Sequence, residues 1–397
     1  MKALKLAVFG TSLLLGSIAH AQTSIKIGVL TDQSGPYSDL SGEGSIVGTK
    51  LAVEEFLAQN KGMSVEVVSA DHQNKPDIGS SIARKWLEQD GVDAVIDVAN
   101  SGVSLAVSQL TKDKDKVFLA TGAASSDLTG KACSPNTVHW VYDTYALSHG
   151  TGSALVKAGG DSWFFLTADY AFGQALERDT AAVVTAEGGK VVGSVKHPLN
   201  TSDFSSFLLQ AQSAKTKVIG LANAGADTVN AIKQASEFGI ADKTKLAALL
   251  FFITDVHSLG LKAAHGLVLT EAYYWDLNET TRAFAKRFAE KMNGRMPTMI
   301  HAGNYSATLH YLKAVAKVGS KSGVAVINEM KKNPTNDVFG AGVLREDGRH
   351  VHDMYLFEVK KPEESKGAWD YYRVLAKIPA ADAFRPLAES TCPLLKK

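Results

Sequence analysis

Three glycines near the start of the chain have a spacing that could hold a phosphate. They are Gly42, Gly44 and Gly48, which read GxGxxxG between the apolar run IKIGVL and a helix-like stretch. Such glycines let backbone N–H groups approach a dinucleotide, and an acid after the next strand, here Asp71, would bind the ribose. The preceding loop, 30–42, is too long for the tight turn that this motif needs. We therefore expect no nicotinamide or flavin site, and predict that Tyr37 and Ser38 of this loop line a pocket instead.

Other signatures of catalysis or metal binding are not found in the sequence. It contains no HExxH, GxSxG or Walker A lysine motif. The histidines are dispersed, and the two cysteines lack the spacing of a zinc site. We therefore predict a protein that is not an enzyme and uses no cofactor and no metal.

Length and charge narrow the class of protein further. The chain has 397 residues, of which 45% are hydrophobic, enough for two domains with sizeable cores. Its 42 basic and 41 acidic residues give a formal charge of +1. Because the basic residues form no block or stripe, we expect no nucleic-acid partner.

The first residues have the pattern of a secretory signal. Lys2 and Lys5 precede the short apolar run LAVFGTSLLLGSI, and the small residues Ala19 and Ala21 fit a cleavage site. A buried N-terminal helix is the alternative. We predict a signal peptide at residues 1–21, cleaved after Ala21, and a periplasmic protein. No later run is long and apolar enough for a membrane helix.

Two cysteines, Cys133 and Cys392, follow the predicted cleavage point. An even number of cysteines in an exported protein favours a disulfide, because the compartment is oxidising. Two free buried thiols are the alternative.

Short apolar runs alternate with helix-like patterns along the chain. The predicted strands are IKIGVL, SVEVVSA, DAVIDV, KVFLA and, after a restart, SWFFLT, KVVGSVKHP, KVIGL and KLAALLFFI. The predicted helices between them cover 45–59, 78–89, 103–110, 172–187, 204–213 and 227–238. Further helices are expected at 280–292, 298–318 and 324–332, and strands at GLVLTEAYYW, HDMYLFEVK and WDYYRVLAKI. This rhythm predicts an α/β fold with two doubly wound parallel-sheet halves.

Ligands in open parallel sheets bind where the strands end. Six loops rich in small residues follow predicted strands, at 31–44, 99–102, 121–129, 168–173, 222–227 and 253–257. In the third loop, Ala123, Ala124 and Ser125 could direct backbone N–H groups and a hydroxyl at a carboxylate. Each loop alone could equally cap a helix or form a turn. Their repetition at strand ends favours a ligand site.

Several of these stretches together resemble a known family. They include IKIGVLTDQSGPYSDLSGEGSIVGTKLAVEEF, DHQNKPDIGSSIARKWLEQDGVDAVIDVANS, TGAASSDLTG, ADYAFGQALERD and ITDVHSLGLKAAHGLVLTEAYYWD. The chain resembles the periplasmic solute-binding proteins of ABC importers, type I fold, in the leucine/isoleucine/valine-binding protein family. The resemblance implies two lobes joined by a three-crossing hinge. Lobe one would comprise 24–143 plus 277–344, lobe two 144–276 plus 345–379, and a tail at 380–397 would return to lobe one. That return makes a bridge between Cys133 and Cys392 reasonable.

The resemblance also implies ligand-binding residues. With the two pocket residues named above, the predicted set is Tyr37, Ser38, Asn100, Ser101, Ala123, Ala124, Ser125, Tyr170, Asn223, Gly225, Thr254 and Asp255. The Ala123–Ser125 loop would bind the ligand's carboxylate, and Tyr170 would cover the ligand from lobe two. Asp255 stands where amino-acid binders of the family carry a glutamate for the ligand's ammonium. Because aspartate is one methylene shorter, an aromatic acid is an alternative to a branched-chain or hydrophobic amino acid. For an aromatic acid, Tyr37, Tyr170 and Phe172 could flank the ring, although each of them could equally belong to the core.

The resulting hypothesis is a monomeric receptor that captures a small carboxylate by closure of a cleft and delivers it to an inner-membrane permease. It does not itself insert in the membrane. A ligand-sensing module of a signalling system is the alternative, and a secreted NAD-dependent dehydrogenase or hydrolase is a third possibility.

Overall fold

The computed structural model describes residues 23–395. The predicted signal peptide therefore lies outside the described residues. Within 23–395, every helix is too short or too polar to cross a membrane.

The first half of the chain builds a parallel five-stranded sheet in the order β2-β1-β3-β4-β5. The strands are β1 (Thr23–Thr31), β2 (Met63–Asp71), β3 (Ala94–Asp97), β4 (Val117–Ala120) and β5 (Thr137–His139). The helices around it are α1 (Gly42–Gln59), α2 (Pro76–Glu88), α3 (Ser101–Asp113), α12 (Met299–Val318) and α13 (Gly323–Lys332). Ile25 and Ile27 of β1 belong to one core with Phe56, whereas Leu30 belongs to another with Trp86. Because both faces are covered, the strands are nearly continuous apolar runs.

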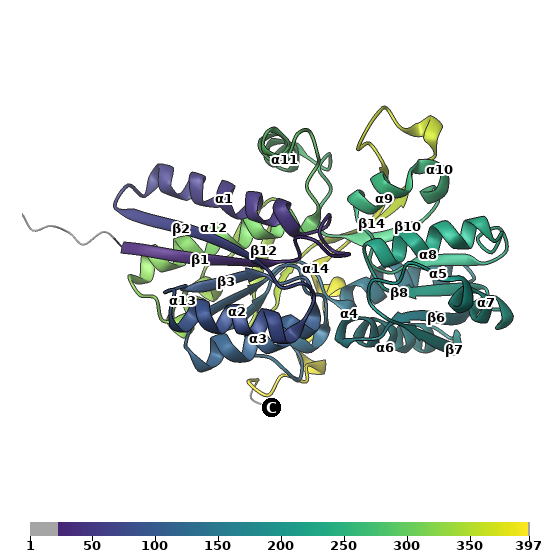
Figure 1. Ribbon diagram of the computed structural model, residues 1–397, viewed down its shortest axis with the longest axis horizontal. Coiled ribbons are helices and arrows are strands. Elements are labelled where there is room, and N and C mark those ends of the chain that lie inside the picture. The colour runs from purple at the N-terminus through teal and green to yellow at the C-terminus, as the bar shows by residue number, and fades with distance from the viewer. Residues whose placement is uncertain (1–22, 396–397) are drawn as a thin grey trace, which may run out of the picture.

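A second parallel sheet has the order β7-β6-β8-β9. Its strands are β6 (Ser162–Ala168), β7 (Lys190–His197), β8 (Val218–Ala222) and β9 (Lys245–Ala248). The accompanying helices are α6 (Ala171–Ala186), α7 (Ser205–Ser213) and α8 (Ala226–Glu237). We call the body around the five-stranded sheet lobe one and the body around this sheet lobe two; Figure 1 shows them side by side. The predicted fold class is confirmed, while the exact residue boundaries of the lobes stay a prediction.

The chain passes between the lobes three times. It leaves β5 for α4 (Thr144–Leu147), leaves β10 (Val268–Glu271) for α11 (Glu279–Lys291), and leaves β13 (His350–His352) for β14 (Met354–Val359). Two small antiparallel sheets accompany these crossings, β10-β14-β15 and β11-β12-β13. Their remaining strands are β11 (Thr335–Asp337), β12 (Gly340–Leu344) and β15 (Tyr372–Ile378).

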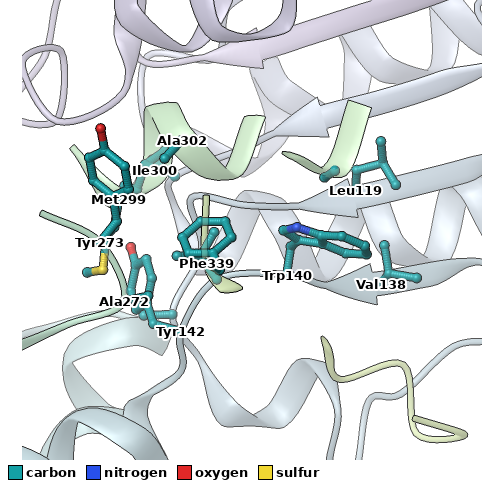
Figure 2. Packing of buried hydrophobic residues seen from close by; sticks show 14 of the residues in the cluster. Leu119, Val138, Trp140, Tyr142, Ala272, Tyr273, Met299, Ile300, Ala302 and Phe339 are labelled. Carbon is teal, nitrogen blue, oxygen red and sulfur yellow. The ribbon is translucent and has the colours of Figure 1, made fainter. Parts of the chain in front are cut away.

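The crossings are packed as part of the core. Trp140, Tyr142, Tyr273, Met299 and Phe339 lie in one continuous buried cluster that also contains residues of both lobes (Figure 2). Because these side chains come from two crossings, from α12 and from the turn between β11 and β12, the hinge region is held by apolar contacts as well as by its backbone.

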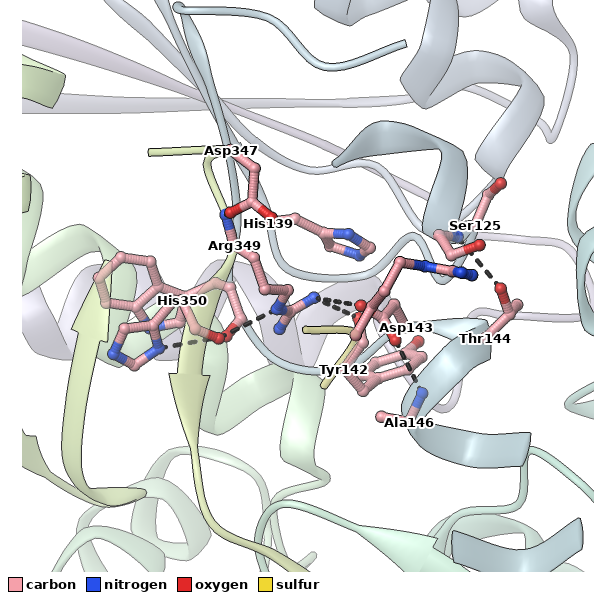
Figure 3. A network of polar contacts seen from close by, with 12 residues as sticks. Ser125, His139, Tyr142, Asp143, Thr144, Ala146, Asp347, Arg349 and His350 are labelled. Carbon is pink, nitrogen blue, oxygen red and sulfur yellow. Dashed lines mark hydrogen bonds and ion pairs between the residues drawn. The ribbon is translucent and has the colours of Figure 1, made fainter. Parts of the chain in front are cut away.

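Arg349 joins two of the crossings (Figure 3). Its Nη1 donates to the carbonyl of Tyr142 at 2.9 Å and lies 3.6 Å from Asp143 Oδ2. Asp143 Oδ1 in turn accepts the N–H of Ala146 and so caps α4. The first and third crossings are therefore tied by a buried ion pair.

Two further sequence predictions have clear outcomes. The disulfide is confirmed: Cys133 and Cys392, separated by 259 positions, have Cα atoms 5.5 Å apart. The strand predicted over 245–253 is too long, because β9 ends at Ala248 and α9 (Ile253–Leu259) begins directly after a buried loop. That loop is apolar because Leu249, Phe251 and Phe252 belong to the buried cores, while Leu250 lines the cavity between the lobes.

Candidate functional site

The strand-end loops of both lobes line a small cavity with about 10 Å³ of free volume. It is lined by Tyr37, Leu40, Ala99, Gly122, Ala124, Tyr142, Tyr170, Phe172, Ala224 and Leu250. Three residues of the predicted set, Tyr37, Ala124 and Tyr170, are therefore brought together in one cavity. We call it the aromatic cavity, since four of its wall residues carry aromatic rings.

The lobes touch each other across this cavity. The hydroxyl oxygens of Tyr37 and Tyr170 lie 2.6 Å apart, and Ala226 N donates to the carbonyl of Pro36 at 3.1 Å. Burial raises the pKa values of both tyrosines above the ordinary value, so both hydroxyls stay protonated. The structure is thus a closed form.

Two wall residues of the aromatic cavity are fixed by contacts behind them. Tyr142, on the first crossing, donates its hydroxyl to the carbonyl of Gly122 at 2.6 Å. Gly122 leaves no room for a side chain, because a Cβ there would lie 2.7 Å from Asp97 Oδ1 and 2.9 Å from the Cα of Ala99. Burial raises the pKa of Asp97 to about 6. The floor of the cavity is therefore held by backbone and buried polar groups.

The Ala123–Ser125 loop presents backbone N–H groups beside the cavity. The N–H of Ser125 donates to Ser101 Oγ at 3.2 Å, and the carbonyl of Ala123 lies 2.7 Å from His139 Nε2. No hydrogen bond within the described residues engages the N–H groups of Ala123 and Ala124. Free N–H groups in a buried loop are suited to an anion. Opposite, α6 begins without a side-chain cap right after Tyr170, so the positive end of its dipole faces the same region.

Other residues of the predicted set have partners inside the protein. Asn100 Oδ1 caps α3 by accepting the N–H groups of its first turn at 2.9 and 3.1 Å. Asn223 lies between the hydroxyl of Thr228, at 2.7 Å, and His197 Nε2, at 3.0 Å. Asp255 Oδ2 accepts the N–H of Phe252 at 2.9 Å at the start of α9, and burial raises its pKa to about 7. Ligand contacts by these three side chains stay a prediction.

Ser38 and Thr254 line a different hollow, of about 250 Å³. It also borders Phe288, Met292 and Arg295. Ser38 faces away from the aromatic cavity because it follows Tyr37 in a tight turn, and its hydroxyl donates to the carbonyl of Gly35 at 2.8 Å. A role for Ser38 and Thr254 in ligand binding therefore also stays a prediction.

Sequence reasoning missed several wall residues. Tyr142, Leu250 and Leu40 were not in the predicted set, although each lies close to a nominated loop or inside an apolar run. Phe172, at the second position of α6 and two residues after Tyr170, was expected only as an aromatic that could flank a ring, and it does line the cavity. Within residues 23–395 no group of three or more metal-binding side chains is gathered in one place.

Comparisons with known proteins all lead to periplasmic binding proteins. The family described as periplasmic binding protein matches residues 24–368. A Leu/Ile/Val-binding protein homologue of Brucella melitensis is 24% identical over 92% of this chain and 94% of its own. A periplasmic binding protein of Burkholderia mallei is 52% identical, with a TM-score of 0.92 over 94% of this chain and 99% of its own.

One further solved structure shares the fold at lower identity. It is a solute-binding protein of an ABC transporter from R. palustris in complex with benzoate, 23% identical, with a TM-score of 0.82 over 94% of this chain and all (100%) of its own. The two-lobed fold and the family match over residues 24–368 indicate the same class of protein. The chain therefore belongs to the periplasmic binding protein family, as a solute-binding protein of the Leu/Ile/Val-binding type and not an enzyme.

Proposed function

We propose that the chain is the periplasmic receptor of an ABC importer and that it binds a small aromatic carboxylate in the aromatic cavity. The observation that carries this proposal is the wall itself, in which Tyr37, Tyr142, Tyr170 and Phe172 come together between the two lobes. Ligand pockets measure roughly 300–1,000 Å³, so the lobes must part to admit a ring and close again with these side chains around it. The R. palustris protein of the same fold binds benzoate, a single ring with one carboxylate.

The polar groups around the cavity favour an aromatic acid over an amino acid. The unengaged N–H groups of Ala123 and Ala124 and the start of α6 suit a carboxylate. An amino acid would also need an acceptor for its ammonium. Asp255, which the family resemblance nominated for that role, does not line the cavity and caps α9 instead. With an aromatic acid, no ammonium group is left without an acceptor in the cavity.

Closure would complete the site. In an open form the ligand would meet the Ala123–Ser125 loop of lobe one, and lobe two would then bring Tyr170 and Phe172 over the ring. The contact between Tyr37 and Tyr170 would exclude water from the buried carboxylate. We propose that this closed form is recognised by an inner-membrane permease, and that the mature chain begins after Ala21.

Ligand binding is the direct test. We expect 4-hydroxybenzoate or benzoate to raise the melting temperature, since a ligand that binds only the folded state stabilises it, and leucine to raise it far less. Tyr170→Leu should weaken binding at least several-fold through lost ring contact. Asp255→Asn should change the affinity for the aromatic acid less than about threefold, because asparagine keeps an acceptor for the Phe252 N–H. A leucine shift larger than that of every aromatic acid would contradict the proposal.

Closure can be tested separately at Gly225. This residue has φ +58°, and a Cβ on it would lie 2.3 Å from the carbonyl oxygen of Pro36 in the other lobe. Gly225→Ala should therefore prevent full closure and weaken 4-hydroxybenzoate binding roughly 10- to 100-fold, measured by calorimetry, since overpacking costs about 1–3 kcal/mol.

A matched control distinguishes the clash from backbone strain. Gly260, also in lobe two, has φ +81° and ψ +148°, and no atom would lie within 4 Å of its Cβ, whereas Gly225 has φ +58° and ψ −135°. Because both conformations lie in the region that glycine alone adopts readily, Gly260→Ala should carry comparable strain but leave the affinity within about twofold. Equal losses in the two variants would mean that the Pro36 contact does not limit closure.

A further inference from the structure

Charged and hydroxyl side chains join the lobes beside the Ser125 loop. Arg178 on α6 of lobe two donates from Nη1 to Asp127 Oδ1 at 3.1 Å and from Nη2 to Ser126 Oγ at 2.8 Å. Ser126 Oγ donates in turn to Asp179 Oδ2 at 2.7 Å. We call Ser126, Asp127, Arg178 and Asp179 the interlobe clamp. None of the four lines the aromatic cavity, so the clamp acts on the ligand only through other groups.

The clamp is supported at the hinge. Thr144, at the first crossing, donates its hydroxyl to Asp179 Oδ2 at 2.6 Å and accepts the N–H of Ser126 at 3.1 Å. Arg178 Nε donates to Asp179 Oδ1 at 2.9 Å. The Asp179 side chain is 4% exposed, and charge-assisted hydrogen bonds are strong where water is excluded. The Arg178 side chain is 46% exposed, so its pair with Asp127 is open to screening by salt.

The clamp is continuous with the proposed carboxylate loop. Ser126 directly follows Ser125, and the N–H of Asp127 donates to Ser125 Oγ at 3.4 Å. Helix α6, which carries Arg178, also packs beside α3, the helix that begins at Ser101. Moving α6 away from the Ser126–Leu128 turn would break the bonds from Arg178 and remove one donor from buried Asp179. The contacts therefore favour the closed arrangement of the loop.

We propose that Arg178 and Asp179 are positioning residues that hold the Ser125 loop and the closed form, and so set ligand affinity without contacting the ligand. This inference rests on the proposed function for its affinity readout. The ligand enters the open form and is retained to the extent that the closed form is favoured over the open one. Loss of the clamp weakens closure over the bound ligand, and its effect appears mainly as faster ligand dissociation.

The experiment compares Arg178→Gln, Asp127→Asn and the double variant with Arg373→Gln. Arg373 is a matched control, since it contacts Glu358 at 2.7 Å and Glu364 at 3.3 Å within lobe two and is 52% exposed. Dissociation of 4-hydroxybenzoate is followed by stopped flow, and ligand-free protein is examined by small-angle X-ray scattering. We expect about three- to tenfold weaker binding for each clamp variant and for the double variant alike. Salt at 0.5 M should narrow the difference between wild type and Arg178→Gln.

The two measurements distinguish a positioning role of the clamp from a general loss of stability. They also distinguish failure of the clamp from failure of the proposed function. Unchanged dissociation in Arg178→Gln, or an equal change in Arg373→Gln, overturns the clamp. If wild-type protein binds no aromatic acid, the proposed function fails and scattering decides on the clamp alone. A larger radius of gyration for ligand-free Arg178→Gln than for wild type and Arg373→Gln supports it, and identical radii overturn it.

Discussion

Arg349→Met is expected to lower the free energy of unfolding by about 3–5 kcal/mol, because it leaves a buried carboxylate without its cation. The Arg349 side chain is 1% exposed, and that of Asp143 is 4% exposed. Burial lowers the pKa of Arg349 to about 10, so the guanidinium is charged at neutral pH. Methionine replaces the apolar stem. Within residues 23–395, Arg349 is the one cation within 4 Å of Asp143, and the Arg385 charge acts on this carboxylate from farther away. Urea denaturation at pH 7 measures the loss.

The free energy of unfolding that Arg349→Met loses should depend on pH, and this dependence identifies the cause of the loss. Burial raises the pKa of Asp143, and the Arg349 charge opposes that rise. Without Arg349 the pKa of folded Asp143 rises further. A carboxyl with a raised folded pKa contributes full stability below its unfolded pKa, about 4, and that contribution is lost as pH rises through the folded pKa. The deficit of Arg349→Met should therefore be small near pH 4 and grow toward pH 8.

A second substitution provides the control. Asp143→Asn keeps an acceptor for the Ala146 N–H that caps α4, at 2.8 Å. The double variant Arg349→Met with Asp143→Asn should regain most of the stability lost at pH 8, because the unpaired charge is gone. Exposed Arg373→Met should cost under about 0.5 kcal/mol. A deficit that is equal at pH 4 and pH 8 would show that lost packing, and not the ion pair, dominates.

The regular part of the fold was predictable because burial on two faces leaves a simple pattern. The apolar run that became β1 and the helix-like stretches that became α1 and α12 were identified at nearly their observed ends. The apolar run after Ala248 was misread, since a strand and a buried loop have the same composition when both are covered. Leu250 lies in that loop and lines the aromatic cavity. A cavity wall and a core position thus look alike in sequence.

The side chains of the candidate site were harder to predict than its loops. Asn100 and Asp255 can bind a ligand or cap a helix with the same oxygen atoms, and here both cap helices. Residue type does not distinguish the two uses; the position of the helix start does. Arg178 and Arg349 show a second limit, since their partners lie up to 207 positions away in the chain. Such pairs depend on how the lobes meet, which periodicity does not encode.

Removing the disulfide is the second change with a large expected effect. Replacing Cys133 and Cys392 by serine should lower the free energy of unfolding by about 2–5 kcal/mol, since the bridge closes a loop across 259 positions of the unfolded chain. The bridge also holds a tail that covers the hinge. In that tail, Phe384 lies under the Arg349 guanidinium at 4.5 Å, and the carbonyl of Arg385 accepts from Arg345 at 2.8 Å.

Because of these contacts, removing the disulfide should release the tail locally as well as lower the melting temperature. Without the bridge, the tail is held only by single contacts such as the Arg385 guanidinium over the Tyr145 ring, at 4.6 Å. Chymotrypsin should then cleave after Phe384, which is buried in the folded tail, much faster than in the oxidised wild type, because cleavage requires local release of the segment. Reduction of the wild type should reproduce both effects of the double serine variant, whereas adding reductant to that variant should change neither. Equal melting temperatures and equal cleavage rates with and without the bridge would mean that packing alone holds the tail over the hinge.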